Sequence, residues 1–421
     1  MTELEEQLET ERTEWGWIKR PIISLSYPQF RQFWLSNFIV ALGMMVGFTA
    51  RGWLMVQLTD SALLLGAVAG TWAVTFGLAS IPMGMLADRV NRRNLLVLGN
   101  GVTLSVTLII GVLVMTDTVA IWHVLVAGAI DGVLFGARYP AGQAITARLV
   151  PRRHLMNAIS LNTVSHSLPN VAGPAVGGVL IAAFGIAAAY FVTSGAFLLA
   201  LLMMLGVAAS FGHVERKAMS SPMNDLREAY AYLLAHRDLL QLTWAMLIPF
   251  ILGQSYVLLL PLFVEKELGR GPETFGALSA TLGAGGVIGA MAVATFGRHR
   301  QLALLMFAGV LGTGACAIAY GLSQWVPVTG AVLLVAGAAE SALFAAYETL
   351  LLLRLPDEMR GRVMGLMFAV VAMFPIGAIV AGAVADVIGL RALAVIEGVI
   401  IVAMASVVWR TVLRHVMAPA Q

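Results

Sequence analysis

The chain has 421 residues, of which 59% are hydrophobic and only 12% are charged, and its formal net charge is +3. Because a soluble domain usually carries about 25% charged residues, this composition excludes an ordinary soluble protein and predicts an integral membrane protein. The basic residues are spread over short loops and do not gather on one face, so we expect no nucleic-acid partner.

A polar segment precedes the apolar sequence. It is rich in glutamate, contains Trp15 and Trp17, and lacks the basic start and apolar core of a secretory signal. We expect residues 1–31 to be a cytoplasmic N-terminal segment, either a short helix at the membrane interface or a partly disordered tail.

Twelve apolar stretches follow, and each is close to the roughly 20 residues that a helix needs to cross a bilayer core. We therefore predict an all-α integral membrane protein with twelve transmembrane helices in two pseudo-symmetric six-helix bundles. The bundles are residues 32–211 and 239–412, joined by a cytoplasmic loop at 212–238 and followed by a cytoplasmic tail at 413–421. The predicted spans are 32–58, 61–87, 94–115, 118–147, 157–183, 185–211, 239–264, 273–297, 301–323, 325–353, 361–387 and 390–412.

Lysine and arginine are distributed unevenly between the loops on the two sides. With both termini on the same side, that side holds twenty-one of the 26 residues, and the other holds Lys266, Arg270 and Arg391. Cytoplasmic loops carry such an excess of basic residues. We predict a multi-pass plasma-membrane protein with both termini in the cytoplasm, and we expect it to be a monomer.

The loop between the second and third spans, residues 84–93, reads GMLADRVNRR. Gly84 would let two backbones approach closely, and Asp88 lies among Arg89, Arg92 and Arg93. Charge bias explains the arginines but does not require the aspartate. The loop is therefore either a topology anchor or a gating loop.

Several ionisable residues fall inside the spans, where a charge is costly and marks a candidate functional position. Arg138 follows Asp131 by seven residues in span four and shares its helix face. Asp131 is either a proton-coupling residue or the permanent partner of Arg138 or of Arg51 in span one. Arg51 reaches the outer surface, pairs with an acid, or anchors an anionic substrate.

Span ten contains two acids, Glu340 and Glu348, which lie two turns apart. A proton carrier must change its charge as its surroundings change from wet to dry. Glu340 is the preferred proton-coupling candidate, and Glu348 suits a relay toward the cytoplasm. Because spans four and ten are symmetry mates, we expect their acids to face a common cavity.

Span five carries a polar stripe, in which Asn162, His166 and Asn170 recur every fourth residue and thus share one face. His166 is a further proton-coupling candidate, although a histidine in a helix is often simply hydrogen-bonded. We expect the two asparagines to contact substrate in the cavity, together with Arg51, Arg138 and Gln254 of span seven.

The 84–93 loop contains Leu86-Ala87-Asp88-Arg89, and three further motifs accompany it: Thr59-Asp60-Ser61, NAISLN at 157–162 and GPAVGG at 173–178. Together they resemble the major facilitator superfamily, and within it the drug:proton antiporter subgroup that includes macrolide effluxers and the enterobactin exporter. This resemblance implies alternating access of a central site, with the proton gradient as energy source and no cofactor. It also implies that Asp88 holds the two bundles together by pairing with the start of span eleven, near Arg360 and Arg362.

We expect a transporter and not an enzyme, because the sequence has no catalytic residue set, no Cys/His metal spacing and no complete phosphate-binding loop. The expected function is proton-coupled efflux of amphipathic small molecules, such as drugs, macrolide-like compounds or siderophores. Its partners are then the small substrate, protons and the lipid bilayer, and no metal is expected. Two alternatives remain open, a lipid or lysophospholipid transporter of the same fold and a non-transporting membrane sensor or scaffold.

Overall fold

The computed structural model describes residues 20–87, 89–212, 222–296, 299–372 and 375–409. Within these ranges the chain forms helices joined by short turns, and no β-strand occurs there. The elements in chain order are η1 (Arg20–Ser26), α2 (Pro28–Leu58), α3 (Ala62–Ala87), α4 (Arg92–Met115), α5 (Ile121–Leu149), η2 (Arg152–His154), α6 (Leu155–Leu205), η3 (Ala209–Gly212), α7 (Pro222–Ala235), α8 (Arg237–Leu258), α9 (Leu260–Lys266), α10 (Pro272–Phe296), α11 (His299–Leu322), α12 (Val326–Arg354), α13 (Asp357–Ala372), α14 (Pro375–Ile388) and α15 (Leu390–Val408).

Nine helices in the described part of the chain are long and apolar enough to cross a membrane. This confirms the predicted all-α membrane fold, although the fifth, sixth and seventh predicted spans differ in their limits. The fifth and sixth spans run together as α6, which turns at Gly185 with a φ of 82° that glycine adopts without steric cost. The seventh span divides into α8 and α9 at Leu259, because Pro261 has no amide hydrogen to continue the helical ladder.

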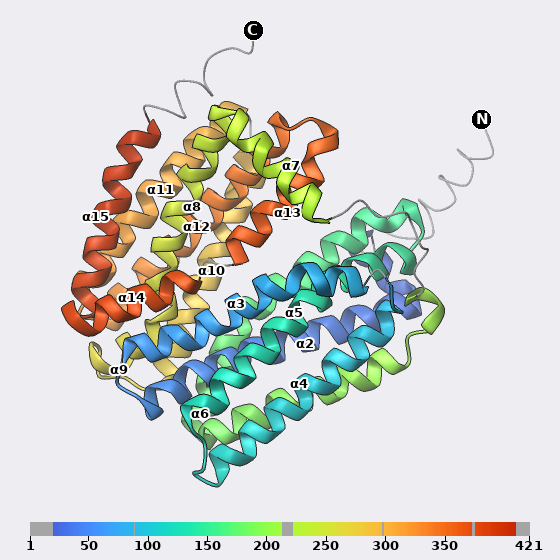
Figure 1. Ribbon diagram of the computed structural model, residues 1–421. Helices are drawn as coiled ribbons and strands as arrows, with labels where there is room; N and C mark the ends of the chain where they lie inside the picture. Colours follow the sequence, from blue (N-terminus) through green and yellow to red (C-terminus); the bar gives the residue numbers. More distant parts are fainter. Residues whose placement is uncertain (1–19, 88, 213–221, 297–298, 373–374, 410–421) are drawn as a thin grey trace.

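The membrane helices gather into two groups (Figure 1). In the first group, α2 packs along α6 and α3 packs along α5. In the second, α10 packs along α12, and α11 lies against both α12 and α15. Two pairs of helices, α3 with α14 and α6 with α10, join the groups. The predicted inter-bundle loop contains a helix, α7, which packs on α13.

Glycines allow the joining helices to touch backbone to backbone. A Cβ added to Gly276 of α10 would lie only 2.8 Å from the Cα of Gly178 in α6, and one added to Gly283 would lie 2.6 Å from the carbonyl oxygen of Asn170. Such small residues are typical of closely packed membrane helices. The two groups are therefore in direct contact along α6 and α10.

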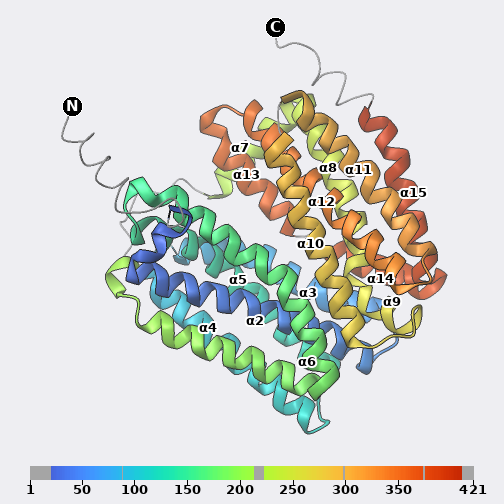
Figure 2. The same cartoon turned by 180° about the vertical axis from the view of Figure 1, so that it is seen from behind.

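The two ends of the molecule differ in charge and in closure. We call the end with the turns at residues 89–91 and 150–154, which carry Arg89, Arg152 and Arg153, the basic end, and the end with the α2–α3 turn the opposite end. The two groups meet around α9, α14 and the start of α3, and they spread apart toward α7 and the α3–α4 turn (Figures 1 and 2). The fold is thus closed at the opposite end.

Asp386, near the end of α14, binds the first turn of α3 across the two groups. Its carboxylate accepts hydrogen bonds from the Ser61 hydroxyl (2.6 Å) and from the backbone amides of Ala62 (2.7 Å) and Leu63 (3.1 Å). The first amides of a helix have no intrahelical acceptor, and the positive end of the helix dipole favours a carboxylate. Asp386 therefore caps α3 and holds the opposite end closed.

Candidate functional site

A cavity of about 310 Å³ lies inside the first group of helices. Helices α2 to α6 supply most of its wall, and residues of α8 to α10 cover it from the second group. Its volume falls within the range of small-molecule sites, roughly 300–1,000 Å³. Trp72 and Phe135 contact each other in its wall, with ring centroids 5.5 Å apart. The large apolar side chains of the lining include Met44, Met45, Phe48, Met55, Trp72, Phe135, Phe197 and Phe275.

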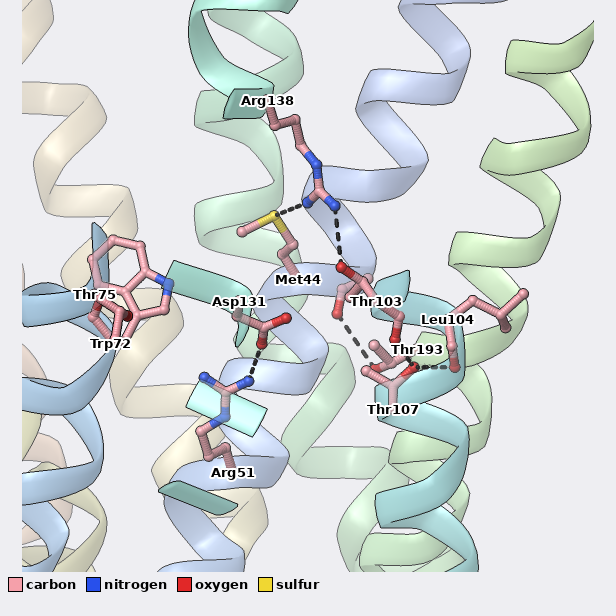
Figure 3. Close-up of polar contacts among 11 residues, drawn as sticks. Met44, Arg51, Trp72, Thr75, Thr103, Leu104, Thr107, Asp131, Arg138 and Thr193 are labelled. Atoms are coloured by element: carbon pink, nitrogen blue, oxygen red, sulfur yellow. Dashed lines mark hydrogen bonds and ion pairs between the residues drawn. The ribbon is translucent and has the colours of Figure 1, made fainter. Parts of the chain in front are cut away.

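An ion pair lies within this apolar wall. The Arg51 guanidinium of α2 donates to the Asp131 carboxylate of α5 (Figure 3). Only 18% and 17% of the two side chains is exposed. The partner of Asp131 is therefore Arg51 and not Arg138, and Arg51 does not extend to the outer surface. A fixed cation beside Asp131 favours a pairing role over proton exchange.

Arg138 lines the same cavity without such a partner. Its guanidinium donates to the Thr103 hydroxyl of α4 (3.2 Å) and to the Met44 sulfur (3.5 Å), and it lies 5.3 Å from the centroid of the Phe197 ring. Its Nε–H is buried and makes no hydrogen bond with the described residues. Figure 3 shows that Arg138 is displaced from the Arg51–Asp131 pair along the direction of the helices.

A second polar cluster lies inside the other group of helices. Glu340 of α12 accepts hydrogen bonds from the Tyr256 hydroxyl (2.9 Å) and the Gln254 amide (2.9 Å), and Glu397 of α15 accepts one from the Ser255 hydroxyl (2.5 Å). The two glutamates are 9% and 5% exposed. Neither forms an ion pair within the described part of the chain. Three consecutive residues of α8 thus hold two buried carboxyl groups.

The expectation of one common cavity for Asp131 and Glu340 is wrong. Asp131 lines the cavity in the first group, whereas Glu340 is buried between α8 and α12. The reason is that the side of α12 that carries Glu340 packs on α8. Gln254 likewise binds Glu340 and does not line the cavity. Glu348 is half-buried two turns further along α12.

The polar stripe of span five does not reach the cavity either. Asn162 is buried, and its amide donates to the Thr146 hydroxyl of α5 (2.7 Å). His166 and Asn170 are exposed, and the Asn170 carbonyl lies against α10 near Gly283. The expected cavity contacts of Asn162 and Asn170 are therefore absent here, because neighbouring helices cover different parts of this face. His166 stays a prediction as a proton-coupling residue.

Arg93 attaches the predicted gating loop to its own group of helices. Asn91 caps α4 by accepting from the Arg93 amide (3.1 Å). The Arg93 guanidinium then donates to the backbone carbonyls of Leu205 (2.6 Å) and Val207 (3.2 Å) at the end of α6. Arg92 begins α4. The loop is thus anchored independently of the second group.

Asp88 lies outside the described residues, so its gating role stays a prediction. Arg89, next to it, is exposed. A Cβ added to Gly84 would meet no described atom within 4 Å, so the expected close backbone approach is absent in this conformation. The two groups are spread apart near this loop, which accounts for the open space.

Glu397 and Tyr256 belong to the polar cluster, but the sequence did not lead us to select them as site residues. An acid inside the twelfth span is the same signal that selected Glu340, so Glu397 was open to prediction. Tyr256 gave no signal, because aromatic residues are common in membrane helices.

Comparison with known proteins identifies the family. The model of the transmembrane secretion effectors matches residues 20–421 of this chain. The chain belongs to this family of the major facilitator superfamily. Enterobactin exporter EntS of Shigella flexneri is 25% identical to this chain over 367 residues, which cover 83% of each protein. Multidrug efflux pump Tap of Mycolicibacterium fortuitum is 25% identical over 358 residues, which cover 81% of this chain and 85% of the pump.

Among solved structures, a bacterial homologue of the human lysosomal transporter Spinster, in an inward-facing and unoccupied conformation, shares the fold. Its TM-score is 0.73 at 17% identity, and the match covers 96% of this chain and 100% of that chain. The predicted resemblance to the superfamily and its efflux proteins is confirmed. The chain is a multi-pass membrane protein of a transporter family.

Proposed function

We propose that this protein exports amphipathic small molecules across the plasma membrane by alternating access, in exchange for protons that enter the cell. The observation that carries the proposal is the separation of two sites in one fold. An apolar cavity with fixed charges suits an amphipathic cargo, and a buried carboxyl group without a cation suits a proton.

Glu340 is the proton carrier in this proposal. A buried, ionised carboxylate is expensive unless a cation pairs with it, whereas the neutral acid needs only hydrogen bonds. Tyr256 and Gln254 supply hydrogen bonds, and no described cation pairs with Glu340. Asp131 differs, because Arg51 keeps it paired. We therefore assign the proton to Glu340 and a pairing role to Asp131.

The basic end faces the cytoplasm in this proposal, because cytoplasmic loops are enriched in Lys and Arg. The structure, closed at the opposite end, then corresponds to an inward-facing conformation. Cargo enters between the spread groups from the cytoplasm or the inner leaflet. Closure of the basic end around the loaded cavity precedes its release outside.

Purified protein in proteoliposomes tests the function. A panel of dyes and antibiotics is supplied on one side, and the pH gradient is imposed in each direction. We expect at least one compound to accumulate against its own gradient only when protons flow the opposite way. Movement no faster than in protein-free liposomes contradicts export, and movement that ignores the pH gradient contradicts proton coupling.

Replacing Asp386 should destabilise the conformation that is closed at the opposite end. Asp386→Ala removes three hydrogen bonds to the start of α3, of which two come from backbone amides. Asp386 is exposed, so we expect a loss of about 1 kcal/mol, roughly a fivefold change in the ratio of the two conformations. The opposite end should then open more often.

Distances between spin labels measure this change. Labels at Thr118 and Gln324, which are exposed in loops at the opposite end, report on the two groups in a Cys316→Ser background. Asp386→Ala should shift the distance distribution to longer values. Glu273→Ala, which removes an exposed acid at the same end, is the matched control. Equal distributions for Asp386→Ala and Glu273→Ala count against a closing role for Asp386.

A further inference from the structure

We propose that the cavity selects amphipathic molecules that carry one anionic group, and that Arg138 binds this group. The inference rests on the proposed export function, because it names the substrate class of the same cavity. The anionic group is a carboxylate, sulfonate or phosphate, and the remainder of the molecule is apolar.

The charges of the cavity are not balanced. Its charged lining residues are Arg51, Asp131 and Arg138, of which two are cationic and one is anionic. Asp131 is already paired with Arg51. Arg138 forms no ion pair with any residue that the structure describes. A cation held among apolar side chains is costly without a counter-charge, so a bound monoanion would neutralise the cavity.

The donors of Arg138 are only partly used. The guanidinium has five N–H bonds, and the Thr103 hydroxyl takes one of them at 3.2 Å. The Met44 sulfur at 3.5 Å is a weak acceptor, and the buried Nε–H has no described partner. A guanidinium binds carboxylate, sulfonate or phosphate oxygens through two parallel hydrogen bonds. The unused donors fit such an acceptor better than they fit a neutral or cationic group.

The surroundings of Arg138 fix its position and supply the apolar surface. Phe197 lies under the guanidinium, 5.3 Å from its carbon atom to the ring centroid, and Thr103 holds one side of it. Trp72 and Phe135 form an aromatic wall of the same cavity. Figure 3 shows Trp72 on one side of the space and Thr103 on the other, with Arg138 reaching between them. An anionic head at Arg138 thus leaves the apolar part of the same molecule against aromatic rings.

Two fluorescent probes that differ by one sulfonate test the inference. The anionic probe is 8-anilinonaphthalene-1-sulfonate, and the neutral one is N-phenyl-1-naphthylamine. Binding to the full-length protein is measured in phosphatidylcholine nanodiscs, with empty discs subtracted. We expect the wild type to bind the anionic probe at least about tenfold more tightly, the scale of one charge-assisted hydrogen-bond pair. Arg138→Gln should reduce this ratio to about one, whereas Arg138→Lys should keep part of it.

Arg227→Gln, at an exposed position of α7, is the matched control and should keep the wild-type ratio. Size-exclusion profiles and thermal unfolding identify any variant that fails to fold, and Arg138→Lys then provides the charge-retaining comparison. Equal binding of the two probes by the wild type, or an unchanged preference in folded Arg138→Gln, overturns the anion site.

Two further experiments identify the source of the anion and distinguish the anion site from the proposed export function. If phosphatidylglycerol in the nanodisc weakens binding of the anionic probe to the wild type but not to Arg138→Gln, a lipid head group occupies the site. If it has no effect, the anion comes from a dissolved amphiphile, and both results retain the site. Transport of the dye and antibiotic panel by the wild type in proteoliposomes tests export alone. Retained export with equal binding of the two probes means that only the anion site fails, whereas absence of export means that the proposed function fails.

Discussion

Glu340→Gln is expected to abolish accumulation of substrate against its gradient while leaving downhill movement intact. The glutamine amide is nearly the same size as the acid, keeps an oxygen for the Tyr256 hydroxyl, and stays neutral at every pH. The variant therefore mimics the protonated carrier but cannot release a proton. In proteoliposomes with an imposed pH gradient, the ratio of inside to outside substrate should fall to about one, and the transport rate should become independent of pH.

Two matched variants locate the effect. Glu397→Gln changes the other buried acid, which lies on α15 and binds the same α8 segment, and Glu348→Gln changes the half-buried acid two turns along α12. If Glu340 is the carrier, uphill transport is lost in Glu340→Gln, and Glu348→Gln slows it without removing the pH dependence. Uphill transport with the wild-type pH dependence in Glu340→Gln would eliminate Glu340 as the proton carrier.

Separating Arg51 from Asp131 should have the largest effect on stability. Either Arg51→Ala or Asp131→Ala leaves one charge unpaired in an apolar wall, a change that costs about 3–5 kcal/mol in a fully buried pair. Because each side chain keeps more than a sixth of its exposure, we expect a coupling energy of about 2 kcal/mol from a double-mutant cycle. Thermal unfolding of the purified protein gives the four values of the cycle.

The Arg362–Glu228 pair provides the control cycle. Its side chains are 37% and 56% exposed at a distance of 2.7 Å, so its coupling should stay below about 1 kcal/mol. The exchanged pair, Arg51→Asp with Asp131→Arg, should recover part of the lost stability and transport. Equal coupling in the two cycles would show that the cavity pair gains nothing from its apolar surroundings.

Much of the fold follows from residue type and spacing. Long apolar stretches bounded by arginines predicted the helices, and the breaks at Gly185 and Leu259 depend on local backbone chemistry that a hydropathy window does not resolve. The partner of Asp131 shows that a shared helix face does not by itself identify an ion pair. A separation of seven residues places Arg138 about 10 Å along the axis, which is too far for an ion pair, so the partner had to come from another helix.

Helix rotation explains the two larger errors at the site. Each residue turns a helix by about 100°, so an eight-residue step from Asn162 to Asn170 rotates the stripe by about 80°. That drift takes it from the α5 contact at Thr146 to the α10 contact at Gly283. Sequence spacing predicts which residues share a helix face, but it does not predict which neighbouring helices cover each part of that face.

Asp131 and Glu340 do not face a common cavity, for a related reason. Counted back from the arginines that end α5 and α12, Arg148 and Arg354, the two acids are three residues out of register. Three residues rotate a side chain by about 60° and displace it by about 4.5 Å along the axis. Related helices in the two halves therefore present their acids to different neighbours.

The break in the seventh span has a consequence for energy transfer. Residues 254–256 of α8 hold the two buried carboxyl groups, and Val257, Leu258 and Pro261 beside the break at Leu259 form part of the cavity wall. Gln254 and Leu258 are about 6 Å apart along the helix axis. In the proposed mechanism, a shift of α8 on protonation of Glu340 would reach the bound cargo through a single helical turn that ends at the break at Leu259. In this mechanism that one turn couples the carboxyl groups to the cavity, and movement at the break would uncouple proton entry from export.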